Sequence, residues 1–314
     1  MLPAAPFEEP LVELRQKIAE LESFPRESAR DREIDKLRGQ LRRDTAEVFA
    51  RLDRWQRALL ARHPERPYVG EYVEHLMEDW VEVHGDRAFG DDPAIVAGFA
   101  RFAGRSVAVI GHHKGRDTKE RIHRNFGQPR PEGYRKALRV MRLAERFGRP
   151  VLTFIDTAGA HPGIGAEERG QAEAIARSTD CCLNLGVPIV SVIIGEGGSG
   201  GAVAIATANR IYMLEHSIYT VASPEAAASI LWRDSARAVD AATNMKITAQ
   251  DLLRLGIIDG IIPEPVGGAH RDGIEVVRAT GETIVQALNA YEGLTPAEIR
   301  KERREKFLAM GRAS

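Results

Sequence analysis

The stretch from 188 to 209 constrains the fold more than any other part of the sequence. It begins with a β-branched apolar run, Ile189 to Ile194, bounded by Pro188 and Gly195, as expected of a buried strand. Five glycines follow between 195 and 201, and an alanine-rich segment that favours helix comes next. A strand therefore runs into a glycine turn that opens a helix. Such a turn exposes backbone N–H groups at the positive end of a helix dipole, where negative charge can be held.

Three known patterns overlap in this turn, so the glycines alone leave its chemistry open. Gly195, Gly197 and Gly200 fit the G-x-G-x-x-G of a dinucleotide site, although the helical segment that follows is short for one. Ser199, with a glycine two residues away on each side, fits the G-x-S-x-G of a nucleophile elbow. A third alternative is an oxyanion hole made of backbone amides, without any side-chain nucleophile. A fourth is a tight packing turn that binds nothing.

Composition and charge exclude several functional classes. With 314 residues, 43% of them hydrophobic, the chain can bury a sizeable core in one or two domains. Its 44 lysines and arginines balance 45 aspartates and glutamates, which argues against a nucleic-acid partner. No apolar run has the length of a transmembrane helix, and no signal-peptide pattern opens the sequence, so we expect a cytoplasmic protein with no membrane partner. The adjacent Cys181 and Cys182 lack disulfide or zinc-ligand spacing, so we expect no metal on this chain.

The N-terminal part of the chain is predicted to form a helical hairpin. Apolar residues three and four positions apart indicate one amphipathic helix before Pro25 and another after it. The residues of these two stripes are Leu11, Leu14, Ile18 and Leu21, then Ile34, Leu37 and Leu41. We therefore expect a hairpin over about residues 8–62, with its charges on solvated faces. The predicted division is an N-terminal hairpin, residues 1–65, and a larger domain, residues 66–314.

A basic segment follows the first predicted strands. Residues 68–83 are predicted to be helical, and 95–101 and 106–110 to form a β-hairpin. The sequence then becomes locally positive on a nearly neutral protein, which suggests an anionic ligand such as the phosphates of a nucleotide-like tail. A solvated helix face and a contact with a partner protein remain alternatives. The basic residues that we single out as ligands are Lys114, Arg116 and Lys119.

Another predicted strand and glycine turn come before those at 188–201. Val151 to Ile155 is predicted to be a buried strand that leads into a glycine-rich turn at 156–165. A long helix is predicted from Glu167 to Leu185, with acidic residues in its first turn. Because crossovers between parallel strands are right-handed, both glycine turns should lie at the same edge of a parallel sheet. The C-terminal part is predicted to be mainly helical, with helices near 225–232, 234–245, 248–255, 272–291 and 296–309 and a short strand near 257–263.

Several long motifs now identify a family. The chain contains GHHKGRDTKERIHRNFG, FIDTAGAHPGIGAEERGQAEAIA, VIIGEGGSGGA, SPEAAASILW and LGIIDGIIPEPVGGAHRD, in that order. These motifs resemble the α subunit of bacterial acetyl-CoA carboxylase carboxyltransferase over nearly the whole chain. The resemblance implies an α/β fold, the crotonase-like ββα superhelix with an N-terminal helical hairpin. It also implies an α2β2 assembly in which the β subunit carries a zinc ribbon.

The resemblance implies a reaction and its site. A carboxyl group would move from carboxybiotin, held on the biotin carboxyl carrier protein rather than on this chain, to acetyl-CoA, forming malonyl-CoA. The backbone amides of Gly200 and Gly201 would hold the biotin carbonyl oxygen, while the enolate of the acyl group forms on the β subunit. The neighbouring residues expected to line the substrate site are Gly197, Gly198, Ser199, Gly159 and Ala160.

This sequence departs from the family pattern at three places. Ala158 stands where the family usually has proline, and His161 where it usually has tyrosine. Ala226 and Ala227 replace a common Gly-Cys pair. None of these changes removes a backbone donor, but the missing proline leaves the shape of the 156–165 turn less constrained.

Two other functions remain open at this point. A serine hydrolase could use Ser199 with Asp259 and His270, which occur in the chain order of α/β-hydrolases. His270 stands next to Gly267-Gly268 and Arg271, in what we expect to be a surface loop. A non-catalytic scaffold subunit would instead use the helical hairpin for association and its glycine turns for packing.

Overall fold

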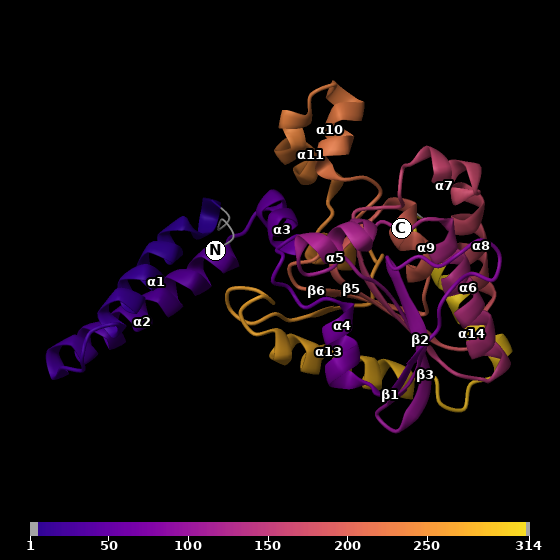
Figure 1. The fold of residues 1–314 in the computed structure, drawn as a ribbon, viewed down its shortest axis with the longest axis horizontal. Coiled ribbons are helices and arrows are strands. Elements are labelled where there is room, and N and C mark those ends of the chain that lie inside the picture. Colours follow the sequence, from indigo (N-terminus) through magenta and orange to yellow (C-terminus); the bar gives the residue numbers. More distant parts are fainter. Residues whose placement is uncertain (1–5, 312–314) are drawn as a thin grey trace.

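The computed structural model describes residues 6–311 and centres on one twisted mixed sheet (Figure 1). Its eight strands are ordered β1-β2-β3-β4-β5-β6-β8, and β7 pairs with the end of β5. The strands are β1 (Glu78–Glu82), β2 (Ile95–Phe102), β3 (Arg105–His112), β4 (Val151–Thr157), β5 (Ile189–Gly198), β6 (Arg210–Leu214), β7 (Ile218–Thr220) and β8 (Gly260–Ile262).

Helices surround this sheet and extend from it. They are α1 (Glu9–Glu22), α2 (Ser28–Ala50), α3 (Arg54–Ala61), α4 (Val69–Leu76), α5 (Thr118–His123), α6 (Pro131–Arg146), α7 (Ile164–Glu168), α8 (Gln171–Asn184), α9 (Ser199–Ala206), α10 (Pro224–Trp232), α11 (Ala238–Met245), α12 (Ala249–Arg254), α13 (Gly273–Asn289) and α14 (Pro296–Ala309). Short 3-10 turns lie at Pro6–Glu8, Asn125–Gly127 and Ser235–Arg237. No helix within residues 6–311 is both long enough and apolar enough to cross a bilayer.

The sheet combines a hairpin with parallel strands, as predicted. β2 and β3 are antiparallel, and the turn between them places Ala103 at φ 47° and Gly104 at φ 77°, the left-handed pair of a two-residue hairpin. β3, β4, β5 and β6 are parallel neighbours. The turns after β4 and β5 therefore lie at the same edge of the sheet, which confirms the predicted arrangement of the two glycine turns.

The core has two layers because β5 is buried on both faces. Ile189 and Ile193 pack under α6, α8 and α9, whereas Val190, Val192 and Ile194 face α4 and α13. Such two-sided burial explains why this strand is a continuous apolar run rather than an alternating one.

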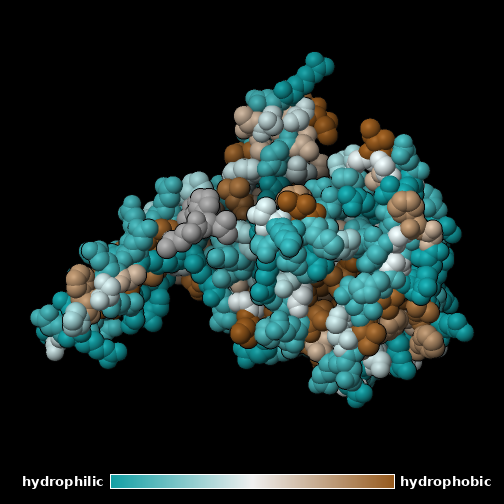
Figure 2. Space-filling model, in the orientation of Figure 1, coloured by the Kyte–Doolittle hydropathy of each residue, from teal (hydrophilic) through white to brown (hydrophobic). Residues whose placement is uncertain are grey.

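The N-terminal helices form the expected hairpin. α1 and α2 lie side by side and extend away from the sheet (Figure 1), with Ile18, Ile34 and Leu37 buried between them. Hydrophilic residues dominate the visible face of this pair (Figure 2), as expected of solvated charges. α3 returns the chain to the core, where Arg54 pairs with Asp251 of α12 at 2.6 Å. The division of the chain at residue 65 stays a prediction.

Three predicted elements are wrong. Residues 68–83 are not one helix: α4 ends at Leu76 and the next residues form the edge strand β1. The helix predicted from Glu167 to Leu185 is two helices, because Gly170 adopts φ 81° and separates α7 from α8. Finally, Gly195 to Gly198 are not a loop but the end of β5.

The C-terminal helix α14 is fixed to the sheet by one fully buried arginine. Arg303 donates hydrogen bonds to the backbone carbonyls of Cys182, Leu185 and Val187 at 2.6–2.7 Å, and to the side-chain oxygen of Asn209. These carbonyls lie at and beyond the C-terminal end of α8, where a positive charge is favoured. Burial lowers the pKa of Arg303 to about 10, so the side chain remains charged near neutrality.

Arg303→Met should lower the free energy of unfolding by about 3–5 kcal/mol, because it leaves several buried acceptors without a donor. Arg304→Met, at the next and exposed position of the same helix, should change it by less than about 0.5 kcal/mol. Urea unfolding followed by circular dichroism measures both. Equal stability of the two variants would show that the buried hydrogen bonds contribute nothing net.

Candidate active site

The two glycine turns contact each other directly at the edge of the sheet. A Cβ placed on Gly198 would lie 2.2 Å from the carbonyl oxygen of Ala158, and one on Gly201 would lie 2.6 Å from the backbone nitrogen of Ala160. Both distances are far shorter than real carbon contacts allow. Glycine is therefore required at 198 and 201 because another backbone occupies the space of a side chain.

The contact holds the start of α9 in a fixed orientation. Ser199 is the first residue of this helix and adopts φ 56°, a strained left-handed conformation for a residue with a side chain. Gly200 and Gly201 complete the first turn, whose N–H groups have no acceptor within the helix. The predicted amide pair thus lies at a helix N-terminus, next to Gly159 and Ala160 of the other turn.

The glycines before this helix belong to a strand rather than to a loop. Gly195, Gly197 and Gly198 belong to the buried end of β5, so they do not form a free phosphate-binding loop. A Cβ on Gly195 would lie 2.5 Å from Oδ1 of Asp156. The glycine therefore makes room for this carboxylate beside the strand.

A network of ion pairs lies at the same edge, on the face of the sheet opposite α9. Asp156 accepts a hydrogen bond from the backbone N–H of Glu196 at 3.0 Å and pairs with Nζ of Lys114 at 2.6 Å. Arg62, the residue that follows α3, then joins Glu196, at 2.8 Å, to Glu225 of α10, at 2.7 Å. The network connects the ends of β3, β4 and β5 to the helical pair α10–α11, which projects from the body in Figure 1.

Sequence reasoning did not single out Asp156, Glu196 and Arg62. The sequence context could have marked two of them as candidates. Asp156 follows an apolar strand, and Glu196 is the one charged residue between 188 and 208. No such context marked Arg62, because its partners are 134 and 163 positions away.

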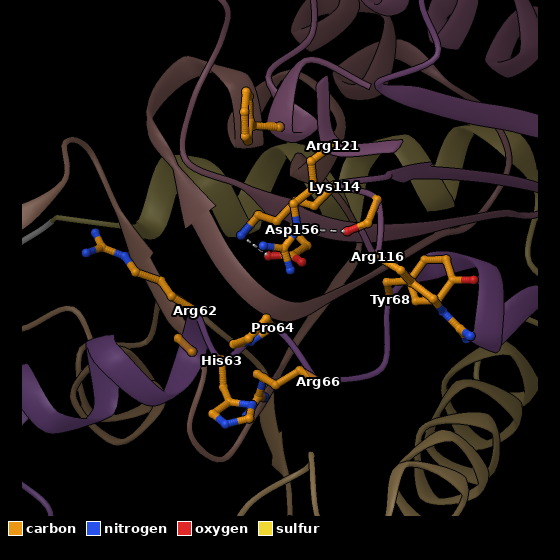
Figure 3. A pocket seen from close by; sticks show the side chains of 12 residues that line it. Arg62, His63, Pro64, Arg66, Tyr68, Lys114, Arg116, Arg121 and Asp156 are labelled. Carbon is orange, nitrogen blue, oxygen red and sulfur yellow. Dashed lines mark hydrogen bonds and ion pairs between the residues drawn. The ribbon is translucent and has the colours of Figure 1, made fainter. Parts of the chain in front are cut away.

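A small pocket of about 250 Å³ opens above this network (Figure 3). Arg116 lies over the ring of Tyr68 at 4.6 Å and pairs with Glu71 at 2.9 Å. Arg66 pairs with the fully buried Glu264 at 2.7 Å. Burial alone would raise the pKa of Glu264, but the Arg66 guanidinium outweighs it and lowers this pKa to about 2. Most cations of the pocket thus already have a carboxylate partner.

The predicted anion ligands are therefore in different environments. Lys114 lies inside the ion-pair network, and Arg116 is held by Glu71. Lys119 is an exposed residue of α5 and forms no ion pair with another described residue. The geometry brings Lys114 to the edge of the glycine turns but does not bring the three cations together on one ligand.

A second and larger pocket, of about 620 Å³, adjoins the first two residues of α9. Ser199 and Gly200 form part of its wall, and most of the remaining wall is apolar. The apolar residues lining it include Val203, Tyr219, Ile247, Leu255, Phe307 and Met310. A ligand with an apolar ring and a hydrogen-bond acceptor therefore fits beside the amides.

The residues of the alternative hydrolase triad are held at separate places. Asp259 pairs with Lys306 of α14 and accepts the backbone N–H of Ile211 at 2.7 Å. His270 stacks on His63 with ring centroids 3.9 Å apart. The expectation that His270 lies in a surface loop is wrong, because its side chain is fully buried against the N-terminal segment.

His270 also belongs to one cluster with the composition of a metal site. Ligand atoms of Glu8, His63 and His270 lie within 4.8 Å of one another. The imidazole planes are inclined by only 24° in their stack, so their nitrogens do not converge on one ion, and Glu8 already pairs with Arg271 at 2.9 Å. We interpret the cluster as the contact that fastens the N-terminal segment to the core.

His112, at the end of β3, is buried beneath the first turn of α9. Its side chain is fully enclosed beside the backbone of Gly201, and neither ring nitrogen forms a well-aligned hydrogen bond with another described residue. Burial, with a smaller contribution from nearby Lys114, lowers the pKa of His112 to about 4, although Asp156 and the backbone of Gly201 act in the opposite direction. The imidazole is therefore neutral near pH 7.

Comparisons with known proteins agree with this geometry. A model of the acetyl co-enzyme A carboxylase carboxyltransferase-like family matches residues 4–311. The acetyl-coenzyme A carboxylase carboxyl transferase subunit alpha of Rhizobium etli is 58% identical, covering 98% of each chain. The protein of the same name from Caulobacter vibrioides is 56% identical, covering 98% of this chain and 97% of its own.

Solved structures show the same fold at low identity. Transcarboxylase 12S superposes with a TM-score of 0.59 at 21% identity, over 72% of this chain but only 42% of its own. A Pseudomonas malonate decarboxylase hetero-tetramer, solved with coenzyme A, gives a TM-score of 0.58 at 18% identity, over 71% of this chain and 87% of that one. These likenesses confirm the crotonase-like α/β fold.

Gly201→Ala should lower the free energy of unfolding by about 1–3 kcal/mol, because its Cβ would force the two glycine turns apart. Gly200→Ala is the matched control in the same helical turn, since its Cβ would lie 3.5 Å from Ile175, an ordinary contact. Urea unfolding of both variants tests the difference. If the two were equally stable, the contact between the turns would not determine this geometry.

The buried His112 should make the protein less stable in weak acid. Because its folded-state pKa of about 4 lies below the ordinary value of 6.5, the unfolded chain binds the extra proton as the pH falls. Through this residue alone, the free energy of unfolding should fall by about 3 kcal/mol between pH 7 and pH 4. His112→Gln should remove that part of the slope in urea midpoints measured from pH 7 to 4. Parallel slopes of variant and wild type would contradict the assignment.

Proposed function

The chain belongs to the family of acetyl-CoA carboxylase carboxyltransferase α subunits, and from this premise we propose how it acts. It transfers a carboxyl group from carboxybiotin to acetyl-CoA, which yields malonyl-CoA. The amides of Gly200 and Gly201 bind the ureido oxygen of biotin. The observation that carries this assignment is the fixed first turn of α9, where Gly200 lines an apolar pocket of about 620 Å³ and Gly201 packs against the turn at 156–165.

The reaction develops negative charge in two places. As the N–C bond of carboxybiotin breaks, electron density shifts to the ureido oxygen, and as the acetyl methyl group loses a proton, density shifts to the thioester oxygen. Preorganised N–H donors aimed at such an oxygen contribute about 3 kcal/mol each. The helix N-terminus adds its dipole to the same position.

The remaining bond changes need no nucleophile from this chain. The carboxyl carbon forms a bond with the acetyl methyl carbon, and the proton from that methyl group goes to the freed ureido nitrogen. Asp259 and His270 contact other residues, so nothing in the geometry favours Ser199 as a hydrolytic nucleophile. The role of this chain is to bind and orient the biotin end and to stabilise charge on its oxygen.

The thioester oxygen requires a second subunit. The relatives of this chain are named as alpha subunits, which implies a β subunit and a carrier for biotin in the complete enzyme. We assign the enolate site and most of the coenzyme A site to that β subunit, with a zinc ribbon on β and an α2β2 assembly. Biotin arrives on its carrier protein as a substrate of this chain.

We place the basic residues Lys114, Arg116 and Lys119 at the edge of the proposed site. Lys114 keeps Asp156 and Glu196 in position behind the glycine turns, at 2.6 and 3.8 Å. The exposed Arg116 and Lys119 are directed to the phosphates of coenzyme A or to acidic groups of the β subunit. Charge reversal at both exposed positions separates these two partners, since only the second affects assembly.

Activity should appear only when this chain is mixed with a cognate β subunit. The assay runs in reverse, with malonyl-CoA and biotin methyl ester as substrates and release of acetyl-CoA as the readout. In the mixture, Gly201→Val should lower kcat at least about a hundredfold, the usual loss when oxyanion donors are displaced. Gly90→Ala, which lies outside both turns and whose Cβ would meet nothing within 4 Å, is the control and should retain full activity.

The controls separate the alternatives. Activity of this chain alone would contradict a shared site. A stable α–β complex without transfer activity would contradict the proposed reaction, and labelling of Ser199 by a fluorophosphonate would support the hydrolase instead.

A further inference from the structure

A charged residue, Lys246, lines the apolar pocket and has no role in the function proposed above. Among the described residues lining this pocket of about 620 Å³, Lys246 is the only charged one. It lies immediately after α11, while Ser199 and Gly200 bring the start of α9 to the same pocket. The pocket therefore combines an apolar wall, an amide pair and one ammonium group.

Lys246 adopts a conformation that costs energy. Its φ is 53° and its ψ is 58°, the left-handed region that glycine usually occupies after a helix. Ser199, at φ 56°, also lines this pocket. Strained residues persist where the surrounding structure over-determines them, and they gather at functional sites. Two strained polar residues on one apolar pocket point to a ligand that uses both.

The backbone on the far side of Lys246 is fixed. The carbonyl of Ile247 accepts the N–H of Tyr219 at 3.0 Å, and Thr248 forms a bridge with Ile218 before capping α12. The lysine is thus joined to a short, anchored segment rather than to a mobile loop.

No carboxylate in the described part of the chain pairs with this ammonium. Lys246 forms no ion pair or side-chain hydrogen bond with another residue between 6 and 311. This distinguishes it from Lys114 and Arg116, which both have acidic partners. An ammonium beside an apolar wall interacts more strongly with an anion than one in bulk water.

We propose that Lys246 recognises the carboxylate that carboxybiotin carries, so that this residue distinguishes the carboxylated from the free form of biotin. The inference rests on the proposed function and extends it. The apolar ring system lies in the pocket, the ureido oxygen meets the Gly200 and Gly201 amides, and the N-carboxylate meets the ammonium. When the N–C bond breaks, the carboxyl carbon becomes bonded to the acetyl carbon and the anion leaves Lys246.

Binding of two stable biotin esters to the α–β complex tests the proposal by calorimetry. One probe is neutral biotin methyl ester, and the other bears a carboxymethyl group on the ureido nitrogen. Lys246→Gly should raise the Kd of the anionic probe about tenfold to a hundredfold, as expected for loss of a charge-assisted contact. The Kd of the neutral probe should change less than about threefold, because its contacts are untouched.

Two further variants separate charge from backbone strain. Lys246→Gly also relieves the left-handed conformation, so its thermal midpoint should not fall. Lys246→Arg keeps the charge and should retain most of the discrimination. Arg233→Gly is the matched control, because Arg233 has φ 56°, follows α10 and does not line the pocket. It should leave both dissociation constants unchanged.

The outcomes distinguish this inference from the proposed function. If the wild-type complex binds both probes but Lys246→Gly binds them as well as Arg233→Gly does, Lys246 is only a helix terminus and the inference fails. If the wild-type complex binds neither probe, the proposed function fails with it. Equal weakening for both probes would also overturn the inference, since it would indicate a collapsed pocket rather than a lost charge contact.

Discussion

The contact between the turn at 156–165 and the junction of β5 with α9, at 198–201, is the constraint on which the rest of the site depends. Backbone lies against backbone, because side chains at Gly198 and Gly201 would overlap Ala158 and Ala160. Parallel pairing of β4 with β5 brings the turns together, and the buried strands behind them prevent them from separating. The first turn of α9 therefore has its donors in place before a ligand arrives, which is the condition for strong electrostatic stabilisation.

Much of the fold could be predicted because its signals are local. The β5 run, the turn at Ala103-Gly104 and the stripes of the N-terminal helices each follow from spacing and residue type. The errors arose where tertiary contacts override local preference. Residues 78–82 become a strand because they pair with β2 at the edge of the sheet, and Gly170 divides a helix whose remaining sequence favours continuity.

The site was predictable only in part. The meeting of the two glycine-rich segments follows from glycine spacing and strand order, whereas the role that we propose for the Gly200 and Gly201 amides comes from resemblance to a family. The ion-pair network does not, since Arg62 meets Glu196 and Glu225 only through the fold. The sequence also does not show which basic residues have an acidic partner. Lys114 has one, whereas Lys246 pairs with none of the described carboxylates. That distinction depends on which carboxylates the fold brings near, and it decides which residues can meet a substrate.

The most direct measurement is a crystal structure of the complete α–β complex with biotin bound. The account predicts the ureido oxygen about 2.7–3.1 Å from the backbone nitrogens of both Gly200 and Gly201, with the apolar rings in the adjoining pocket. An oxygen bound instead by the Ser199 hydroxyl alone, or a biotin ring outside that pocket, would contradict the central role of the amide pair.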